Sequence, residues 1–161
     1  MKRSKSQSYE GLQGHIRKLK TPQIEVWKNQ YPDREYTVHL EVPEFTCICP
    51  KTGLPDFAMI HVTYAPAKTC IELKSFKYYT IFYRDVGIFH EHLVNKILDD
   101  IVQACAPRWV KVEATMNLRG GIQTTVEAEY KGTKILRGRL RRLKSGGAAP
   151  LSGQFPKETL C

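Results

Sequence analysis

A cysteine followed by proline, and a carboxylate seven residues later, are the side chains of this 161-residue chain best suited to covalent chemistry. Pro50 removes a backbone donor after Cys49 and fixes φ, and Lys51 places a cation beside the sulfur. Both features are typical of an exposed loop thiol with thiolate character. The turn at 51–55 can return the carboxylate of Asp56 toward the sulfur, which would place a nucleophile and an acid on one loop. The alternative is a structural cysteine in a turn with a surface aspartate.

The remaining cysteines do not favour a metal site or a disulfide framework. Structural zinc prefers two to four residues between paired cysteines and a second ligand pair, whereas Cys47 and Cys49 are separated by one residue. The five cysteines are an odd number with no CxxC pair, in a chain long enough to fold without cross-links. We therefore expect no metal and no disulfide framework.

Charged side chains also gather at the expected starts of two helices. Glu72, Lys74 and Lys77 lie at a strand-to-helix junction, where the lysines could bind a phosphate or simply form a solvated helix face. His90 and Glu91 open a second helix, where free N–H donors and the helix dipole favour a carboxylate. Glu91 is then an ordinary N-terminal charge or an acceptor for the two N–H donors of a guanine-type base edge.

Charge and hydropathy limit the classes of partner. The net charge is +9, but residues 1–20 carry +5 and residues 131–148 carry +7, which leaves −3 for residues 21–130. Because charge runs at chain ends are usually solvated, we expect no stable nucleic-acid binding. Apolar runs are too short for a membrane span and the start lacks a secretory signal, so we expect a cytoplasmic protein. No GxGxxG or Walker motif is present, so a bound dinucleotide would not lie in a Rossmann crevice.

The elements that must position these groups can be predicted from the spacing of apolar residues. Alternation predicts strands at 36–42, 57–66, 110–118 and 122–130, with Pro43 ending the first strand. A hairpin-like turn at Arg119-Gly120-Gly121 joins the last two strands. Between the two strand pairs, helical spacing predicts one helix beginning near Lys74 and a longer one within 87–107. The order predicts an α+β fold, an antiparallel sheet with two helices on one face.

The same patterns predict which side chains face the core. In the strands these are Tyr36, Val38, Leu40, Val42, Ala58, Ile60, Val62, Tyr64, Val110, Val112, Ala114, Met116, Leu118, Ile122, Thr124, Val126, Ala128 and Tyr130. In the helices they are Leu73, Phe76, Thr80, Tyr83, Phe89, Leu93, Val94, Ile97, Leu98, Ile101, Val102 and Cys105.

Taken together, these motifs resemble the short, single-domain form of the NADPH-dependent 7-cyano-7-deazaguanine reductases, the QueF family of the tunnelling-fold (T-fold) superfamily. Residues 72–79, Glu-Leu-Lys-Ser-Phe-Lys-Tyr-Tyr, match the family signature. That signature begins with Glu, has a Lys on each side of an apolar position, and ends with an aromatic residue. The loop FTCICPKTGLPDF, the triplet FHE at 89–91 and RGGI at 119–122 also match. The likeness covers roughly residues 25–137.

The resemblance implies a reaction and a division of labour. Cys49 would attack the nitrile carbon of 7-cyano-7-deazaguanine to form a thioimide, and Asp56 would handle the proton. Two NADPH would complete reduction to the aminomethyl base, a step of queuosine tRNA-modification biosynthesis. The family assembles as rings with sites between subunits, so a homo-oligomer is implied. By the same resemblance the substrate would be bound by Ile71, Glu72, Leu73, His90 and Glu91, and NADPH by Lys74, Ser75, Lys77, Arg119 and Gly120.

Two other functions stay open at this point. The related QueF-like amidinotransferases act on cyano-deazaguanine already in tRNA, but they lack the signature that this chain keeps at 72–79. A non-catalytic nucleic-acid-binding module is the third reading.

We divide the chain into a basic N-terminal segment (1–24), a T-fold nitrile reductase domain (25–140) and a flexible C-terminal tail (141–161). We expect removal of residues 2–18 or 145–161 to change reduction of the free base little.

Overall fold

Alternating apolar side chains build one four-stranded antiparallel sheet, whose strands stand in the order β2-β3-β5-β6. In this computed structural model, which describes residues 13–132, β2 spans Val38–Ile48 and β3 spans Pro55–Ala65. The other two strands are β5 (Trp109–Met116) and β6 (Thr125–Lys131). Side chains that point inward from β3 and β5 are fully buried, as expected from the period of two along a strand. The predicted alternation of these two strands is confirmed.

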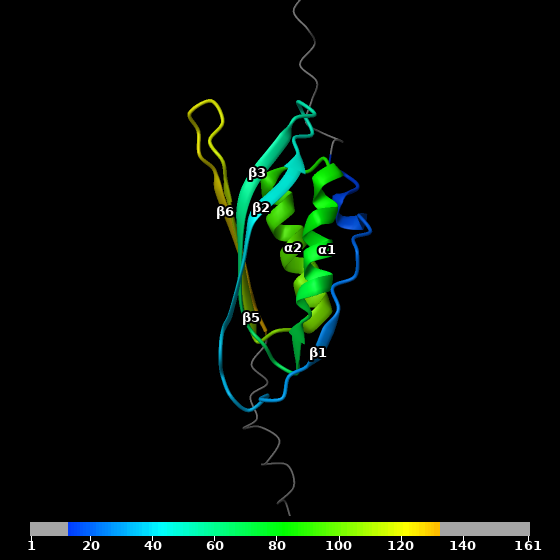
Figure 1. Cartoon of the computed structure of the whole chain (residues 1–161), viewed down its shortest axis with the longest axis vertical. Coiled ribbons are helices and arrows are strands. Elements are labelled where there is room, and N and C mark those ends of the chain that lie inside the picture. Colours follow the sequence, from blue (N-terminus) through cyan, green and yellow to red (C-terminus); the bar gives the residue numbers. More distant parts are fainter. Residues whose placement is uncertain (1–12, 133–161) are drawn as a thin grey trace, which may run out of the picture.

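Two helices cover one face of this sheet, as predicted (Figure 1). Helix α1 spans Leu73–Phe82 and continues into the 3-10 turn η2 (Tyr83–Asp85). Helix α2 spans His90–Cys105 and runs antiparallel to α1. Its apolar stripe packs on β5 and β6 at the 3.6-residue spacing that the sequence predicted. The buried residues of α2 are Leu93, Val94, Ile97, Leu98, Ile101 and Cys105.

The N-terminal part of the described chain packs against the helices. A 3-10 turn, η1 (Ile16–Lys18), precedes strand β1 (Val26–Lys28), which pairs with β4 (Thr69–Ile71) in a separate two-stranded sheet. Ile16 and Ile24 belong to the main hydrophobic core. This packing argues against the expectation that residues 2–18 can be removed with little effect. The predicted tail beyond residue 140 lies outside the described residues.

The prediction that Pro43 ends its strand is wrong, because β2 runs through it. The pairing of β2 with β3 shifts by one residue between Val42 and Phe45, which is a β-bulge. Strand β2 lies at the edge of the four-stranded sheet, where a proline without an N–H donor is tolerated. The bulge also changes which residues face the helices: Val42 is half-buried before it, and Phe45 and Cys47 are buried after it.

Four residues predicted to face the core are exposed instead: Leu73, Leu118, Ile122 and Tyr130. Leu118 and Ile122 flank the hairpin between β5 and β6, which extends beyond the helices that would cover it (Figure 1). The hairpin itself is confirmed, since Arg119 and Ile122 exchange backbone hydrogen bonds and the two glycines between them have positive φ. Leu73, the first residue of α1, is exposed, whereas Tyr79, which was not among the residues predicted to face the core, is buried.

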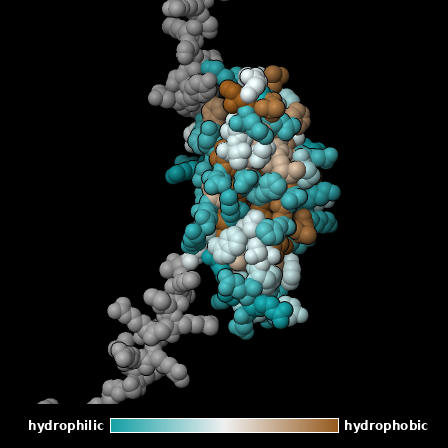
Figure 2. Space-filling model, turned by 90° about the vertical axis from the view of Figure 1, so that its left-hand side faces the viewer, coloured by the Kyte–Doolittle hydropathy of each residue, from teal (hydrophilic) through white to brown (hydrophobic). Residues whose placement is uncertain are grey.

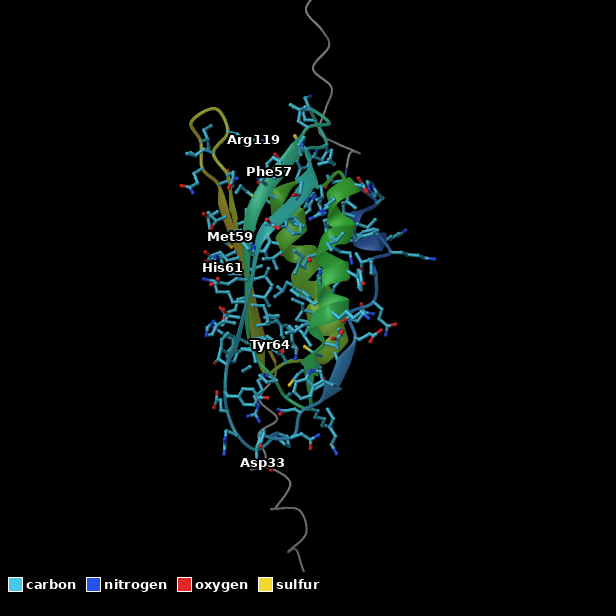
Figure 3. The ribbon with its side chains drawn as sticks, viewed as in Figure 1. Asp33, Phe57, Met59, His61, Tyr64 and Arg119 are labelled. Carbon is cyan, nitrogen blue, oxygen red and sulfur yellow. The ribbon has the colours of Figure 1, made fainter. Side chains whose placement is uncertain are left out.

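The other face of the sheet is largely hydrophilic, with apolar side chains among the polar ones (Figure 2). Phe57, Met59 and His61 of β3 point to this side, whereas Tyr64 points toward the helices (Figure 3). On this face the Lys111 ammonium lies 2.6 Å from a Glu127 carboxylate oxygen. None of the helices in residues 13–132 is both long and apolar enough to cross a membrane.

Candidate active site

A buried aspartate forms the centre of the candidate site. Asp56 lies on β3 opposite Cys47 of β2 and is only 2% exposed. Its Oδ2 is 3.2 Å from Nε2 of His90, the first residue of α2. The guanidinium of Arg119 reaches back from the β5–β6 hairpin to form an ion pair with Oδ1, and it also donates a hydrogen bond to the Pro55 carbonyl (2.6 Å). The alternative of a surface aspartate is therefore excluded.

Asp56 Oδ1 is in contact with a charge but is not fully satisfied. The ion pair with Arg119 does not have the geometry of an ordinary hydrogen bond, and among the described residues no donor is hydrogen-bonded to this buried oxygen. Buried polar atoms are normally hydrogen-bonded. A buried carboxylate oxygen in this state can accept a further donor, which suits a group that takes part in proton transfer.

The loop after β2 presents Cys49 to hydrogen-bond donors. The Cys49 carbonyl accepts from the Gly53 amide, and the Cys49 amide donates to Leu54, each at 2.9 Å, which closes a tight turn. Gly53 has φ of +70°, a left-handed conformation that glycine adopts without strain. Partial burial raises the pKa of the Cys49 thiol, but hydrogen bonds from Thr52 and Lys51 outweigh it and leave this pKa below its usual value. The nearby Asp56 charge partly opposes this lowering.

The neighbouring Cys47 has the opposite character. It is fully buried beside Asp56, and burial, together with the smaller effect of the negative charge of Asp56, raises its pKa to about 12. Because the thiolate is the nucleophilic form of cysteine, Cys47 is inert near neutral pH. The structure thus separates two cysteines that the sequence places two residues apart, and Cys49 is the one with thiolate character.

The start of α2 brings a second carboxylate to the same end of the fold. Glu91 comes directly after His90 and its side chain is exposed. The bridge between Ile48 and Gly87 joins the end of β2 to the segment that leads into α2. Cys49, Asp56, His90 and Glu91 therefore lie where the end of β2 meets the start of α2. Arg119, labelled in Figure 3, approaches them from the hairpin. Gly120, at the tip of that hairpin, is exposed as well.

The other predicted site residues form a separate group where α1 begins. Glu72 is the N-cap of α1, and its two carboxylate oxygens accept the amides of Lys74 (2.8 Å) and Ser75 (2.7 Å). Those hydrogen bonds lower the pKa of Glu72, so its carboxylate is anionic near neutral pH. The Ser75 hydroxyl donates to the Glu72 carbonyl and accepts from the Glu25 amide. Glu72 and Ser75 thus hold the helix start together.

The lysines of this group are free to face a ligand. Lys74 and Lys77 are exposed, and Leu73 and Lys77 border a groove of about 440 Å³ between α1 and β2. Ile71 is buried beneath them as the last residue of β4. Two exposed ammonium groups beside an exposed apolar side chain suit a ligand that carries both phosphate and an apolar ring.

Within one chain, the two groups lie at opposite ends of helix α1. Helix α1 begins at the Glu72 group and ends near the segment that leads to His90, and its ten residues correspond to about 15 Å of rise. The sequence reasoning expected sites between subunits, but it did not say which of these residues each subunit supplies. Within residues 13–132, no three His, Cys, Asp or Glu side chains gather closely enough to hold a metal ion.

Two contributors to the site were missed at the sequence level. Thr52, whose hydroxyl and amide lower the pKa of Cys49, stands three residues after the cysteine, at the fourth position of the turn that begins with Cys49. That spacing could have identified it. Gln13, whose side chain contacts the start of α2, is 76 residues away from Phe89, and no periodic pattern reports such a contact.

An α+β scaffold that gathers a cysteine and a buried carboxylate at one end of its sheet is suited to an enzyme with a nucleophile and an acid. Residues 55–134 match the family of QueF-like proteins. The NADPH-dependent 7-cyano-7-deazaguanine reductase of Chlorobaculum tepidum is 56% identical over 111 residues, which are 69% of this chain and 95% of that protein. The enzyme of the same name from Halorhodospira halophila is 56% identical over 109 residues, or 68% and 92% of the two chains.

A solved structure supports the same grouping. The crystal structure of the archaeosine synthase QueF-Like in the apo form superimposes with a TM-score of 0.55 at 28% identity. It covers 60% of this chain and 94% of that chain. The chain is an enzyme, and it belongs to the QueF family.

Proposed function

We propose that this enzyme reduces the nitrile of 7-cyano-7-deazaguanine to the aminomethyl group, with two NADPH and a thioimide on Cys49, as a step of queuosine biosynthesis. The observation that carries the proposal is the lowered pKa of Cys49 beside the buried Asp56, in a chain 56% identical to enzymes named for this reaction. The thioimide forms when Cys49 Sγ bonds to the nitrile carbon and the thiol proton is transferred to the nitrile nitrogen. The Asp56 carboxylate is the group that takes this proton from the thiol and passes it to the nitrogen.

The residues around Asp56 support that role by holding the carboxyl in place. His90 bonds one oxygen and Arg119 pairs with the other, so the side chain is fixed from two different elements. A proton donor in a fixed position needs no reorganisation when the nitrile nitrogen approaches. The exposed Glu91, which follows His90 in the chain, can accept the two N–H donors of the deazaguanine edge.

The cofactor residues fit NADPH in their chemistry. NADPH supplies one hydride when bound, and a nitrile needs two hydrides to become a primary amine. Lys74 and Lys77 are exposed cations that can pair with its phosphates, and Arg119 and Gly120 lie on an exposed hairpin. Ser75 can contribute through one lone pair of its hydroxyl oxygen. The hydroxyl proton is already donated to the Glu72 carbonyl, and the other lone pair accepts from the Glu25 amide.

We further propose that a complete site needs a second copy of the chain, in a ring-like assembly of the T-fold type. The length of α1 separates Glu72, Ile71 and Leu73 from Cys49 within one chain, so both groups can touch one substrate only if they come from different subunits. In a single chain Glu91 is exposed and Cys49 only partly buried, whereas an imine intermediate hydrolyses unless water is excluded. A neighbouring subunit would supply that cover.

The second candidate function is the amidinotransferase reaction on cyano-deazaguanine in tRNA. The structural likeness to an archaeosine synthase favours it. The identity to that protein is 28%, half of the 56% shared with the reductases, and the chain keeps Glu72, Lys74 and Lys77 of the reductase signature. Reduction of the free base is therefore the better-supported function.

Intact mass spectrometry tests the proposed chemistry directly. The enzyme mixed with the nitrile base and no NADPH should gain one substrate mass per chain. Cys49→Ala should lose this adduct and Cys47→Ala, the matched control, should keep it. With NADPH present, the wild-type enzyme should consume two NADPH per product, and Asp56→Asn should be slower by ~10² or more, the scale for a positioned acid. An adduct on Cys47, or turnover of nitrile-bearing tRNA without NADPH and no reduction of the free base, would overturn the proposal.

A further inference from the structure

The segment that leads into α2 is held along both of its edges. On one side it pairs with the backbone of the cysteine loop: the Ile48 amide donates to the Val86 carbonyl (2.9 Å), and the Ile88 amide donates to the Ile48 carbonyl (3.0 Å). This side connects the segment to Cys49, the residue after Ile48 in the chain. Gly87 lies against Pro50, since a Cβ on this glycine would be 3.9 Å from the Pro50 Cα.

The other edge is held by a single side chain from the N-terminal segment. The side-chain nitrogen Nε2 of Gln13 donates to the Gly87 carbonyl (3.2 Å). The backbone amide of Phe89 donates to the side-chain oxygen Oε1 of Gln13 (3.1 Å). The same oxygen lies 3.2 Å from Nδ1 of His92, in the first turn of α2. Gln13 thus bonds the backbone on both sides of residue 88, much as a neighbouring strand would.

These contacts hold the start of α2, where the helix's own N-cap residue forms no side-chain hydrogen bond. The N-cap residue Phe89 has no side-chain acceptor, so it makes no side-chain cap. The next two residues are His90, which bonds Asp56, and Glu91. A shift of Phe89 would therefore move both the partner of Asp56 and the proposed acceptor for the substrate.

Gln13 is itself held in place by the packing of residues 16–24. Ile16 is buried in the core, three residues after Gln13. Further along the segment the Thr21 hydroxyl donates to Asp100 Oδ2 (3.2 Å) on α2, and Asp100 also accepts from Tyr79 (2.8 Å). Residues 16–24 thus fix the point from which Gln13 reaches the start of α2.

We infer that Gln13 is a positioning residue, which sets the place of His90 and Glu91 relative to Cys49 by clamping residues 87–89 against the cysteine loop. The inference rests on the proposed function, because it assigns Glu91 to the substrate and His90 to Asp56. It adds a residue outside the part of the chain that matches the family, residues 55–134.

The test compares Gln13→Met with Gln23→Met, an equal change in the same N-terminal segment. Methionine keeps the length of the side chain and removes both hydrogen-bonding groups. We expect Gln13→Met to raise KM for the nitrile base by ~10-fold or more with a smaller change in kcat, the scale on which misplaced binding groups act. Gln13→Glu keeps an oxygen for the Phe89 amide and should recover part of the loss. Gln23→Met should match the wild type.

Hydrogen exchange provides a readout that does not depend on the reaction. Amide exchange in a peptide covering residues 86–93 should be faster in Gln13→Met than in Gln23→Met, at a temperature where both variants are folded by circular dichroism. Unchanged exchange in this peptide would overturn the inference, and so would faster exchange with KM and kcat both unchanged. If the wild-type enzyme neither binds nor reduces the base, the proposed function fails. Exchange then decides alone whether Gln13 holds residues 87–89.

Discussion

Removing either partner of the Asp56–Arg119 ion pair should destabilise the fold, but by unequal amounts. The Asp56 side chain is 3% exposed and the Arg119 side chain is 42% exposed. Asp56→Asn leaves a guanidinium that water can solvate, so we expect a loss of about 1 kcal/mol in the free energy of unfolding, typical of a screened pair. Arg119→Met leaves a buried carboxylate with His90 as its remaining partner among the described residues. An uncompensated buried charge of this kind costs about 3 kcal/mol.

The double variant separates this argument from a general effect of mutation. Once Asp56 is neutral, loss of Arg119 strands no buried charge, so the double variant should be less destabilised than Arg119→Met alone. Urea unfolding followed by tryptophan fluorescence measures all three variants, at one protein concentration because self-association shifts apparent stability. Lys111→Met, which removes exposed ion pairs, is the control and should change stability by less than about 0.5 kcal/mol. Equal losses for the two single variants, or a larger loss for Asp56→Asn, would refute the reasoning.

Three further outcomes are expected at the site and the chain end. Glu91→Gln should weaken binding of the nitrile base by about 30-fold, or ~2 kcal/mol, because an amide replaces only part of a two-oxygen acceptor. Calorimetry measures this affinity. An unchanged affinity would mean that Glu91 is an ordinary charge at the start of a helix. The thiolate forms above the pKa of a thiol, so alkylation of Cys49 should be half-maximal below pH 9.0, while Cys47, with a pKa of about 12, stays unreactive. Peptide mass spectrometry after iodoacetamide should show this midpoint move to higher pH in Thr52→Val, and an unmoved midpoint would contradict the role of the Thr52 hydroxyl. Deletion of 145–161 should leave KM for the free base unchanged at moderate salt, whereas a steep loss of activity with salt would indicate contact with several tRNA phosphates.

Much of the fold could be predicted because it depends on local periodicity. The alternation in β3 and β5 and the stripe of α2 result directly from burial of one face, so the sequence pattern and the structure agree there. The alternation of apolar residues was misleading where strands extend beyond the helices that pack on the sheet. Leu118 and Ile122 continue the alternation of their strands, but no helix of the described chain lies over the hairpin at that point.

The candidate site was only partly predictable, for a related reason. Cys49 and Asp56 lie on one hairpin, so sequence proximity and turn chemistry brought them together correctly. The bonds that connect Asp56 to His90 and Arg119 cross 34 and 63 residues of chain, and only tertiary packing determines them. The separation of Glu72 from Cys49 within one chain could not be predicted, because a motif states which residues occur together in sequence and not at which end of a helix they lie.

The bulge in β2 makes the position of a length change in this strand more important than the change itself. Because one extra residue lies between Val42 and Phe45, the residues that face the helices change from even to odd numbers, and Cys47 shares that face with Asp56. Deletion of Pro43 or Glu44 would remove the bulge and restore regular alternation, so Phe45 and Cys47 would keep their face of the sheet. Deletion of Thr46 would instead place Cys47 next to Phe45 in the chain and turn it toward the opposite face. A library of single-residue deletions across β2 should therefore find the enzyme far less tolerant between Phe45 and Cys47 than at the bulge.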